Sequence, residues 1–256
     1  MTIVICCNKE YFVKAKIFFD SLVQNWHGRV CVLCIDFEPE QKIEGFEYAT
    51  CEVEKLPSYR QGWPANRDFF VCCEGGDFFD YFYFKQDELV ICIDADMIMQ
   101  RRMNPSEKLI LENMQRGDIA MSVSAKPAMS LREEFFRLRP KRNYLKTNKD
   151  YPGRLGAIKL FCTGIIIARA STYKEIGDKY IAAIDNMIMN FDHHAAGQWL
   201  FSFLAKDYNV IDLGNTFQNA SWFIDTDAVD GDYLTHGVDG QIVLFNHTKF
   251  MREYLY

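Results

Sequence analysis

The 256-residue chain lacks the features that mark several classes of protein. It has no run of about 18 uninterrupted apolar residues, the length that a membrane-spanning helix requires. Its opening residues, Thr2-Ile-Val-Ile-Cys-Cys7, carry no basic stretch and no cleavage site, so they predict a strand and not a secretory signal peptide. An internal repeat and a low-complexity stretch are also missing. These absences predict one globular domain without a transmembrane segment.

Positive charge is also scarce. The chain has 29 Lys and Arg against 35 Asp and Glu, which gives a net charge of −6 and argues against a general affinity for nucleic acid. One local basic stretch, residues 137–142, is either a solvated loop or a site that attracts an anionic acceptor.

The nine cysteines follow no spacing that is typical of a disulfide framework or a zinc site. Most lie in apolar, strand-like runs, which predicts buried reduced thiols and a cytoplasmic location. Cys31 and Cys34 form a C-x-x-C pair, but three residues apart on a strand they face opposite sides. Because no second pair follows at zinc-site spacing, we expect no zinc site.

Hydrophobic periodicity predicts a chain in which strands and helices alternate. The predicted strands cover residues 2–7, 30–35, 46–53, 88–94, 118–123, 160–168 (interrupted at Thr163-Gly164), 210–213, 218–223 and 241–245. The predicted helices cover residues 10–25, 67–84 (in one piece or two around Gly75-Gly76), 106–114, 171–189 and 193–206. The β-α-β-β start implies an α/β fold with a mostly parallel sheet wound with helices.

We therefore predict a single domain over residues 1–256. Within it, the pattern weakens and turns basic between residues 124 and 157. This segment reads as a lid or acceptor loop and not as a second domain.

One apolar run, residues 89–99, is interrupted only by two carboxylates, Asp94 and Asp96. On a strand, side chains at i and i+2 point to the same face. Two like charges held together in apolar surroundings are costly unless a cation joins them or one takes up a proton. In open α/β sheets the carboxyl ends of strands bind ligands. The pair therefore predicts a divalent metal site, and the alternative is a solvated strand end with two incidental acids.

Hard cations such as Mg²⁺ and Mn²⁺ prefer oxygen ligands and often bind substrate phosphates as well. A metal here would stabilise a diphosphate leaving group as a Lewis acid. Near the C-terminus, His247 follows an apolar strand. A nitrogen ligand from His247 favours Mn²⁺ over Mg²⁺, and Lys249 could then pair with phosphate oxygens. The alternative for His247 is a hydrogen-bonded histidine at the edge of the core.

Five segments of the chain follow one another as in a known enzyme family. They are Ile3-Val-Ile-Cys-Cys-Asn8-Lys-Glu-Tyr11, Ile93-Asp-Ala-Asp-Met97, Phe161-Cys-Thr-Gly164-Ile-Ile-Ile, Gln198-Trp-Leu-Phe-Ser-Phe-Leu and Phe245-Asn-His247. In this order they resemble motifs of the nucleotide-sugar glycosyltransferases of GT-A fold: the uracil-binding turn, the D-x-D motif, the donor-sugar strand, the glutamine helix and the terminal histidine. The resemblance is strongest to glycosyltransferase family eight, which includes glycogenin and bacterial lipopolysaccharide galactosyltransferases.

The resemblance implies a single GT-A, Rossmann-like domain that transfers a hexosyl or pentosyl group from a UDP-sugar donor, with retention of configuration. It implies that Mn²⁺ (or Mg²⁺) lies between Asp94, Asp96, His247 and the diphosphate. Asn8 and Tyr11 would hold the uracil, Arg67 would reach the phosphates or the donor sugar, and Cys162, Thr163 and Gly164 would form the wall of the sugar pocket. Cys6, Ala95 and Lys249 complete the expected nucleotide-sugar site, and Gln198 would lie beside the anomeric carbon.

Two departures from the family pattern concern the sugar pocket. Gly197 stands where the family usually has an Asp before the Gln, and Asp192, six residues upstream of Gln198, is the candidate substitute. In the segment Asp192-His193-His194, Asp192 serves either as a helix N-cap or as a residue of the pocket. Cys162 stands where Asn is common, which removes an amide. The donor sugar therefore stays open.

The acceptor also stays open: a glycan, a lipid-linked glycan, a protein or a nucleic-acid base. Two other functions are compatible with the sequence. One is a non-catalytic module that binds sugar nucleotides or glycans. The other is a phosphohydrolase of haloacid-dehalogenase type, which also uses an Asp-x-Asp strand end with the first Asp as nucleophile. That class places the motif near the N-terminus, whereas here it begins at residue 94.

Overall fold

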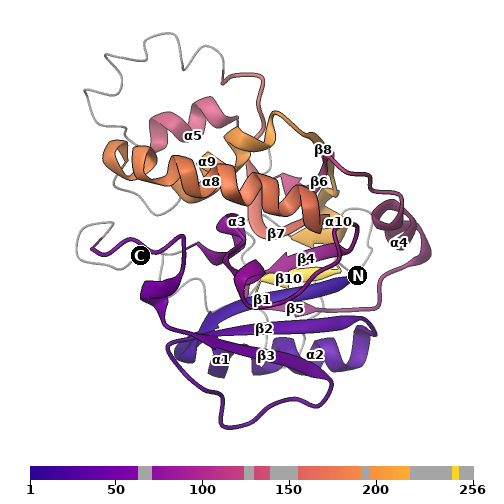
Figure 1. Cartoon of the computed structure of the whole chain (residues 1–256). Helices are drawn as coiled ribbons and strands as arrows, with labels where there is room; N and C mark the ends of the chain where they lie inside the picture. The colour runs from indigo at the N-terminus through magenta and orange to yellow at the C-terminus, as the bar shows by residue number, and fades with distance from the viewer. Residues whose placement is uncertain (63–70, 124–129, 139–154, 192–195, 220–243, 248–256) are drawn as a thin grey trace, which may run out of the picture.

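The computed structural model describes residues 1–62, 71–123, 130–138, 155–191, 196–219 and 244–247. Their largest element is a seven-stranded sheet in the order β3-β2-β1-β4-β7-β6-β8 (Figure 1). The strands are β1 (Thr2–Asn8), β2 (Arg29–Ile35), β3 (Phe46–Cys51), β4 (Leu89–Ile93), β6 (Asp118–Val123), β7 (Phe161–Arg169) and β8 (Asn209–Asp212).

Most neighbouring strands of this sheet run parallel. β1 pairs in parallel with β2 and β4, β2 with β3, and β6 with β8. The exception is β7, which runs antiparallel to both of its neighbours, β4 and β6. The predicted α/β fold with a mostly parallel sheet is thus confirmed.

The central strands are buried on both faces, which explains their nearly continuous apolar sequences. On β1, Val4 packs into one core cluster, while Ile3 and Ile5 pack into the other. On β2, Cys31 and Cys34 divide in the same way, so the C-x-x-C pair faces opposite sides as predicted. The sheet therefore separates two apolar layers.

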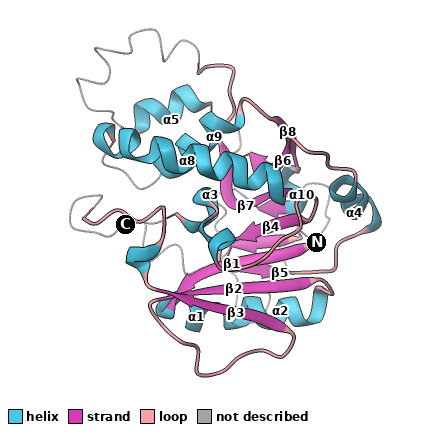
Figure 2. Cartoon of the chain, in the orientation of Figure 1, coloured by secondary structure: helices cyan, strands magenta, loops and turns pink. Residues whose placement is uncertain are grey.

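Helices cover both layers (Figure 2). On one side lie α1 (Lys9–Lys14), α2 (Lys16–Asn25) and α4 (Pro105–Glu112). On the other lie α3 (Cys72–Gly75), α5 (Leu131–Arg137), α8 (Ala170–Asn190) and α9 (Ala196–Ala205). No helix in the described part of the chain is both long enough and apolar enough to cross a bilayer.

A second, three-stranded sheet has the order β5-β10-β9 and was not predicted. Its strands are β5 (Met97–Met99), β9 (Gln218–Asn219) and β10 (Phe245–His247). The remaining short elements are α10 (Gly214–Phe217) and the 3₁₀ helices η1 (Val53–Lys55) and η2 (Asp77–Asp80). The buried side chains of β5 and β10 join the core layer that contains α2.

Four predicted elements differ from the structure. In its described part, the helix predicted over residues 67–84 is only the short α3 and the 3₁₀ helix η2. The helix predicted over residues 10–25 is two helices, because a turn at Ala15 separates α1 from α2. The segment 124–157 is not wholly irregular, since it contains α5, which starts with a capping box between Ser130 and Glu133. Strand β7 runs through Thr163-Gly164 without interruption. The structure does not test the predicted single domain or the role of residues 124–157 as a lid.

Helices α3 and α8 approach each other closely at two glycines. A Cβ atom built on Gly177 of α8 would lie 2.6 Å from the carbonyl oxygen of Gly75 in α3. A backbone carbonyl cannot swing aside as a flexible side chain can. The contact therefore fixes the position of α3, which carries residues of the candidate site described below.

We predict that Gly177→Ala destabilises the protein, although alanine is the better helix former. The added methyl group should push α3 away from α8 and lower the free energy of unfolding by about 1–3 kcal/mol. Urea unfolding measures this. The control Ala182→Gly, at an exposed position of the same helix, should cost only about 1 kcal/mol of helix propensity. A Gly177→Ala protein at least as stable as the wild type would contradict the close approach.

Candidate functional site

The two carboxylates of the D-x-D motif lie in the turn that leaves β4. The strand ends at Ile93, and residues 94–96 lead directly into β5. The prediction that strand alternation sets their common direction is therefore wrong, because residues 95 and 96 form a turn. Asp94 is partly exposed, whereas Asp96 is 4% exposed and Ala95 between them is buried. Both carboxylates nevertheless stay at the carboxyl end of β4.

The second sheet brings the C-terminal histidine position to this turn. In the antiparallel pairing of β10 with β5, His247 lies opposite Met97, the residue that follows Asp96. The described part of His247 is its backbone in β10. Arg67, Asp192 and Lys249, which we also predicted for the site, lie outside the described residues.

The donor set at the turn fits a hard divalent cation. Asp94 and Asp96 contribute carboxylate oxygens, and both oxygens of Asp96 are buried. Two like charges in one largely buried turn favour a bound cation, and carboxylates suit Mg²⁺ and Mn²⁺. Within the described residues, no three Asp, Glu, His or Cys side chains gather closely enough to hold a metal. A third protein ligand would thus come from a residue such as His247.

Tyr11 lies beside this turn, at the carboxyl end of the neighbouring parallel strand β1. Its hydroxyl pKa is raised by burial and, in addition, by the negative charges of Asp96 and Asp94. Asn8 ends β1 and caps α1, because its Oδ1 accepts a hydrogen bond from the Tyr11 backbone N–H at 2.9 Å. Capping occupies one lone pair of Asn8 and leaves its amide N–H₂ group as the donor that a ligand would meet.

Four thiols lie close to one another beside the turn, and Cys73 among them contacts Asp94: Cys6 of β1, Cys72 and Cys73 of α3, and Cys92 of β4. The Sγ atoms of Cys92 and Cys73 are 3.1 Å apart, and the Cys73 thiol donates to Asp94 Oδ1 at 3.7 Å. Hydrogen bonds with the three other thiols, together with burial, raise the pKa of Cys6 well above its ordinary value. The Cys6 side chain, predicted for the nucleotide site, is thus engaged within this thiol cluster.

Strand β7 places the predicted sugar-pocket wall against the D-x-D turn. Ile165 pairs with Ile93, and the Asp94 backbone N–H donates to the Gly164 carbonyl oxygen at 3.0 Å. On the other edge of β7, the pairing with β6 shifts register between Ala120 and Ser122. The stretch from Cys162 to Gly164 therefore lies beside Asp94.

Side chains from two further elements hold this wall. The Gln218 side chain of β9 donates to Cys162 Sγ at 3.3 Å. The carboxyl group of Glu74 in α3 lies near Thr163: burial raises the pKa of Glu74, and the Thr163 hydroxyl acts in the opposite direction. Helix α9 docks on the start of the same strand, because Ser202 Oγ accepts a hydrogen bond from the Phe161 backbone N–H at 3.1 Å.

Gln198, the predicted residue beside the anomeric carbon, lies in the first turn of α9 and is partly exposed. Its neighbour Gly197, which stands where the family usually has Asp, is buried. Helix α9 contacts both β7 and α3. The fold therefore positions Gln198 on a helix that packs against the Thr163 wall.

Sequence reasoning missed Cys73, Glu74 and Gln218, which contact Asp94, Thr163 and Cys162 respectively. None of the three belongs to a motif. The only sequence signal is a single glutamate in the small apolar segment Val71-Cys72-Cys73-Glu74-Gly75. That signal identifies no partner, because the partner residues come from strands that lie far along the chain.

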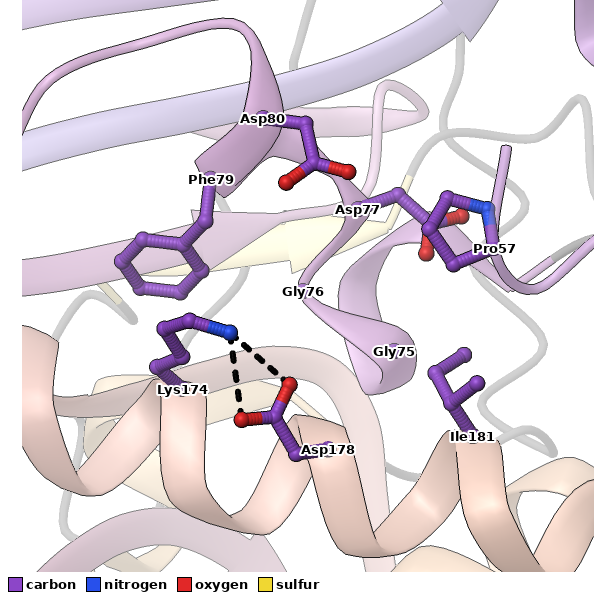
Figure 3. A pocket seen from close by; sticks show the side chains of 9 residues that line it. All are labelled: Pro57, Gly75, Gly76, Asp77, Phe79, Asp80, Lys174, Asp178 and Ile181. Carbon is purple, nitrogen blue, oxygen red and sulfur yellow. Dashed lines mark hydrogen bonds and ion pairs between the residues drawn. The ribbon is translucent and has the colours of Figure 1, made fainter. Parts of the chain in front are cut away.

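A separate pocket of about 150 Å³ lies between α3, η2 and α8, and none of the residues predicted for the site lines it (Figure 3). On its floor, Lys174 forms an ion pair with Asp178 at 2.9 Å. Asp77, which is 2% exposed, also lines it, and its Oδ2 accepts a hydrogen bond from the Ser58 hydroxyl. Its other oxygen, Oδ1, is buried without a hydrogen-bond partner among the described residues. Burial raises the pKa of Asp77 to about 6.

We predict that Asp77 makes stability depend on pH. Because its pKa is about 6 in the folded protein and near 3.8 in the unfolded chain, the folded state binds its proton more tightly. Its contribution is fully present below pH ~4 and is lost as pH rises through ~6, a loss of about 2–3 kcal/mol.

Asp77→Asn should remove this loss and make the variant the more stable protein at pH 8. Urea unfolding at pH 4, 6 and 8 measures it. Asp87→Asn, at an exposed carboxylate that does not line the pocket, is the control and should follow the wild-type pH dependence. An Asp77→Asn protein whose stability falls with pH as steeply as the wild type would contradict the assignment.

No protein-family model matches this sequence, and no curated protein matches it. Solved structures do. The chain is similar to the galactosyltransferase LgtC in complex with donor and acceptor sugar analogues, with 12% identity and a TM-score of 0.56 over 97% of this chain and 87% of that one. An active-site glutamine-to-glutamate variant of LgtC has the same identity and coverage and a TM-score of 0.57. Mouse xyloside xylosyltransferase 1 gives 12% identity and a TM-score of 0.55 over 97% and 98% of the two chains.

At this identity the likeness shows the fold. The chain has the GT-A glycosyltransferase fold, and the resemblance in fold that the five ordered segments predicted is confirmed. The roles of individual site residues stay predictions.

Proposed function

We propose that this protein is a metal-dependent glycosyltransferase that moves a hexosyl or pentosyl group from a UDP-sugar to an acceptor, with retention of configuration. One observation carries the proposal: the D-x-D turn, the β10 strand with His247 and the β7 wall meet at the carboxyl end of β4. The fold, shared with solved galactosyl- and xylosyltransferases, supports it.

The nucleotide end of the donor would lie between β1 and the D-x-D turn. Asp94, Asp96 and His247 would hold Mn²⁺ or Mg²⁺, which when bound neutralises charge on the diphosphate leaving group. Tyr11 and Asn8 would bind the uracil. Tyr11 lies beside both carboxylates, and the helix cap uses the side-chain oxygen of Asn8 but not its amide N–H₂ group. Arg67 and Lys249 would pair with phosphate oxygens. Cys6 and Ala95 would contribute backbone groups.

The sugar end would lie against β7. The proposed wall consists of Cys162, Thr163 and Gly164, and a backbone hydrogen bond joins its last residue, Gly164, to Asp94. Gln198 would approach the anomeric carbon from α9, and the LgtC variant described as an active-site glutamine mutant supports a role for glutamine in such enzymes. We propose Asp192 as the acid that stands in for the residue replaced by Gly197.

Retention needs no side-chain base in this arrangement. In a front-face transfer, an oxygen of the departing phosphate accepts the proton of the acceptor hydroxyl. The side chains would then orient the sugar and shield it from water. We propose no narrower acceptor than a glycan, a lipid-linked glycan, a protein or a nucleic-acid base, and the cytoplasmic location stays a prediction.

Nucleotide binding gives the first test. We expect UDP and UDP-sugars to raise the melting temperature with Mn²⁺ present and much less without it. At 100 times the dissociation constant, binding stabilises the folded state by about 2.7 kcal/mol. ATP and CDP at the same concentrations are the controls. Stabilisation by ATP or phosphate mimics, with none by any uridine nucleotide, would reject the proposal.

The second test concerns the D-x-D carboxylates. Asp96→Asn should lower the rate of UDP release from the donor by on the order of 100-fold. Even the loss of a residue that only hydrogen-bonds to a metal ligand lowers metal affinity or activity by about 10- to 100-fold. Asp212→Asn, at an exposed carboxylate at the end of β8, should leave the rate unchanged. Full turnover by Asp96→Asn would remove its metal role. If the protein binds the donor but neither hydrolyses it nor transfers its sugar, a non-catalytic binding module is favoured. Release of phosphate from phosphomonoesters would favour a phosphohydrolase.

A further inference from the structure

The side chains of Cys73 and Cys92 bring two sulfur atoms together beside the D-x-D turn. Both cysteines are free thiols, and their Sγ atoms are 3.1 Å apart. Because the S–S bond of a disulfide is about 2.05 Å long, the two atoms need to approach by only about 1 Å to form one. Thiols can also meet in a core as ordinary packing, but this pair has a further contact: the Cys73 thiol donates to Asp94 Oδ1 at 3.7 Å.

The backbones that carry the two sulfur atoms are both held in place. The Tyr173 hydroxyl donates to the Cys73 carbonyl oxygen at 2.8 Å, and the glycine contact between α3 and α8 fixes the same short helix. Cys92 lies in β4, which pairs with β1 on one side and with β7 on the other. The two sulfur atoms can therefore approach each other by side-chain rotation, without movement of either backbone.

The two thiols differ in their access to the candidate site. Cys92 is 0% exposed, in the middle of the sheet. Cys73 is 8% exposed and contacts Asp94, which is itself partly exposed at the carboxyl end of β4. A small oxidant that enters the site at Asp94 therefore meets Cys73 first, and Cys92 is the second thiol in reach.

We propose that Cys73 and Cys92 are an oxidative modification site: a hydroperoxide converts the two thiols to a disulfide bond, and this bond weakens the binding of a divalent metal at the D-x-D turn. In the first step the O–O bond of the hydroperoxide breaks, one oxygen joins Cys73 Sγ as a sulfenic acid, and an alcohol (water in the case of hydrogen peroxide) leaves. The sulfur of Cys92 then displaces the hydroxyl group, which leaves as water with the thiol proton of Cys92. The two thiols supply two electrons in total, and the hydroperoxide accepts them.

The disulfide bond acts on Asp94 through the loss of one proton. A disulfide sulfur carries no hydrogen, so Cys73 can no longer donate to Asp94 Oδ1. Residues that orient a metal ligand through a hydrogen bond are worth about 10- to 100-fold in metal affinity. This effect rests on the proposed function, in which Asp94 is a metal ligand, whereas the formation of the bond does not.

Peptide mapping tests the bond itself. The full-length protein is treated with hydrogen peroxide, its remaining thiols are alkylated, and it is digested with trypsin. Peptide 68–85 contains Cys72 and Cys73, and peptide 86–101 contains Cys92. We expect the two peptides to be joined, with a mass two hydrogen atoms below their sum, and dithiothreitol to separate them. The joined peptides should persist in Cys72→Ser and disappear in Cys73→Ser.

Metal affinity tests the consequence, without any turnover. Electron paramagnetic resonance of free Mn²⁺, with UDP present, compares the reduced and the oxidised protein. Oxidation should weaken Mn²⁺ binding by about 10- to 100-fold, and dithiothreitol should restore it. Cys92→Ala keeps the proton of Cys73 but cannot form the bond, so it should bind Mn²⁺ as the reduced wild type does, before and after peroxide. Cys73→Ala lacks the donor and should bind as weakly as the oxidised wild type in both conditions.

Cys34→Ala is the matched control. Cys34 is also 0% exposed, but it lies on β2 and packs into the core layer on the opposite face of the sheet from Cys73 and Cys92. This variant should form the disulfide bond and lose Mn²⁺ affinity as the wild type does. The circular dichroism spectrum of the oxidised protein should match that of the reduced protein, since no backbone has to move.

The absence of joined peptides after peroxide treatment overturns the inference while the proposed transfer stands. A mapped bond that leaves Mn²⁺ affinity unchanged overturns it as well, and so does a peroxide-induced loss of affinity in Cys92→Ala or unfolding of the oxidised wild type. A reduced wild-type protein that binds neither Mn²⁺ nor UDP overturns the proposed function instead. The effect on metal binding then falls with it, and the peptides alone decide whether the bond forms.

Discussion

The site depends on the reversed direction of one strand. In a parallel sheet, only carboxyl ends of strands reach the ligand-binding edge. Because β7 is antiparallel to β4, its first residues reach that edge and extend past the end of β4 at Ile93. The hydrogen bond from the Asp94 N–H to the Gly164 carbonyl oxygen continues the pairing of the two strands one residue beyond Ile93. Thr163 and Gly164 therefore come to lie beside the D-x-D turn although they are far from it in sequence.

Two of the contacts that Asp94 makes within the described residues are with neutral groups. Its backbone N–H bonds to a carbonyl oxygen, and its side chain accepts from a thiol. Neither partner carries a positive charge. Thiols also pack as small apolar groups, so the cluster beside the turn lowers the local polarity without supplying a lysine or arginine. Low polarity next to the turn strengthens the attraction between the carboxylates and a bound cation.

The sequence was sufficient to predict those elements whose bounds depend on the local pattern of residues. Strand β6 spans residues 118–123, as its apolar run predicted, and the break between α3 and η2 falls at Gly76, which has φ +67°. Helix α5 carried a readable signal, the capping box from Ser130 to Glu133, that the basic composition of its neighbourhood obscured. By contrast, the contacts of Glu74 and Gln218 join elements 89 and 56 residues apart in sequence, and strands of two or three residues have too little periodicity to predict.

In this arrangement, the two ends of a nucleotide-sugar donor would contact different elements of the fold. In the proposed function, the nucleotide side would be formed by β1 and the start of α1, and the sugar side by β7, α3 and α9, which contact one another. Between them lies the D-x-D turn, which contacts both sides through Tyr11 and Gly164. A change at Cys162 or Gly197 can therefore alter the sugar pocket while the carboxylates keep their positions. This explains how a chain can depart from the family pattern at the sugar wall and still retain both acids of the turn.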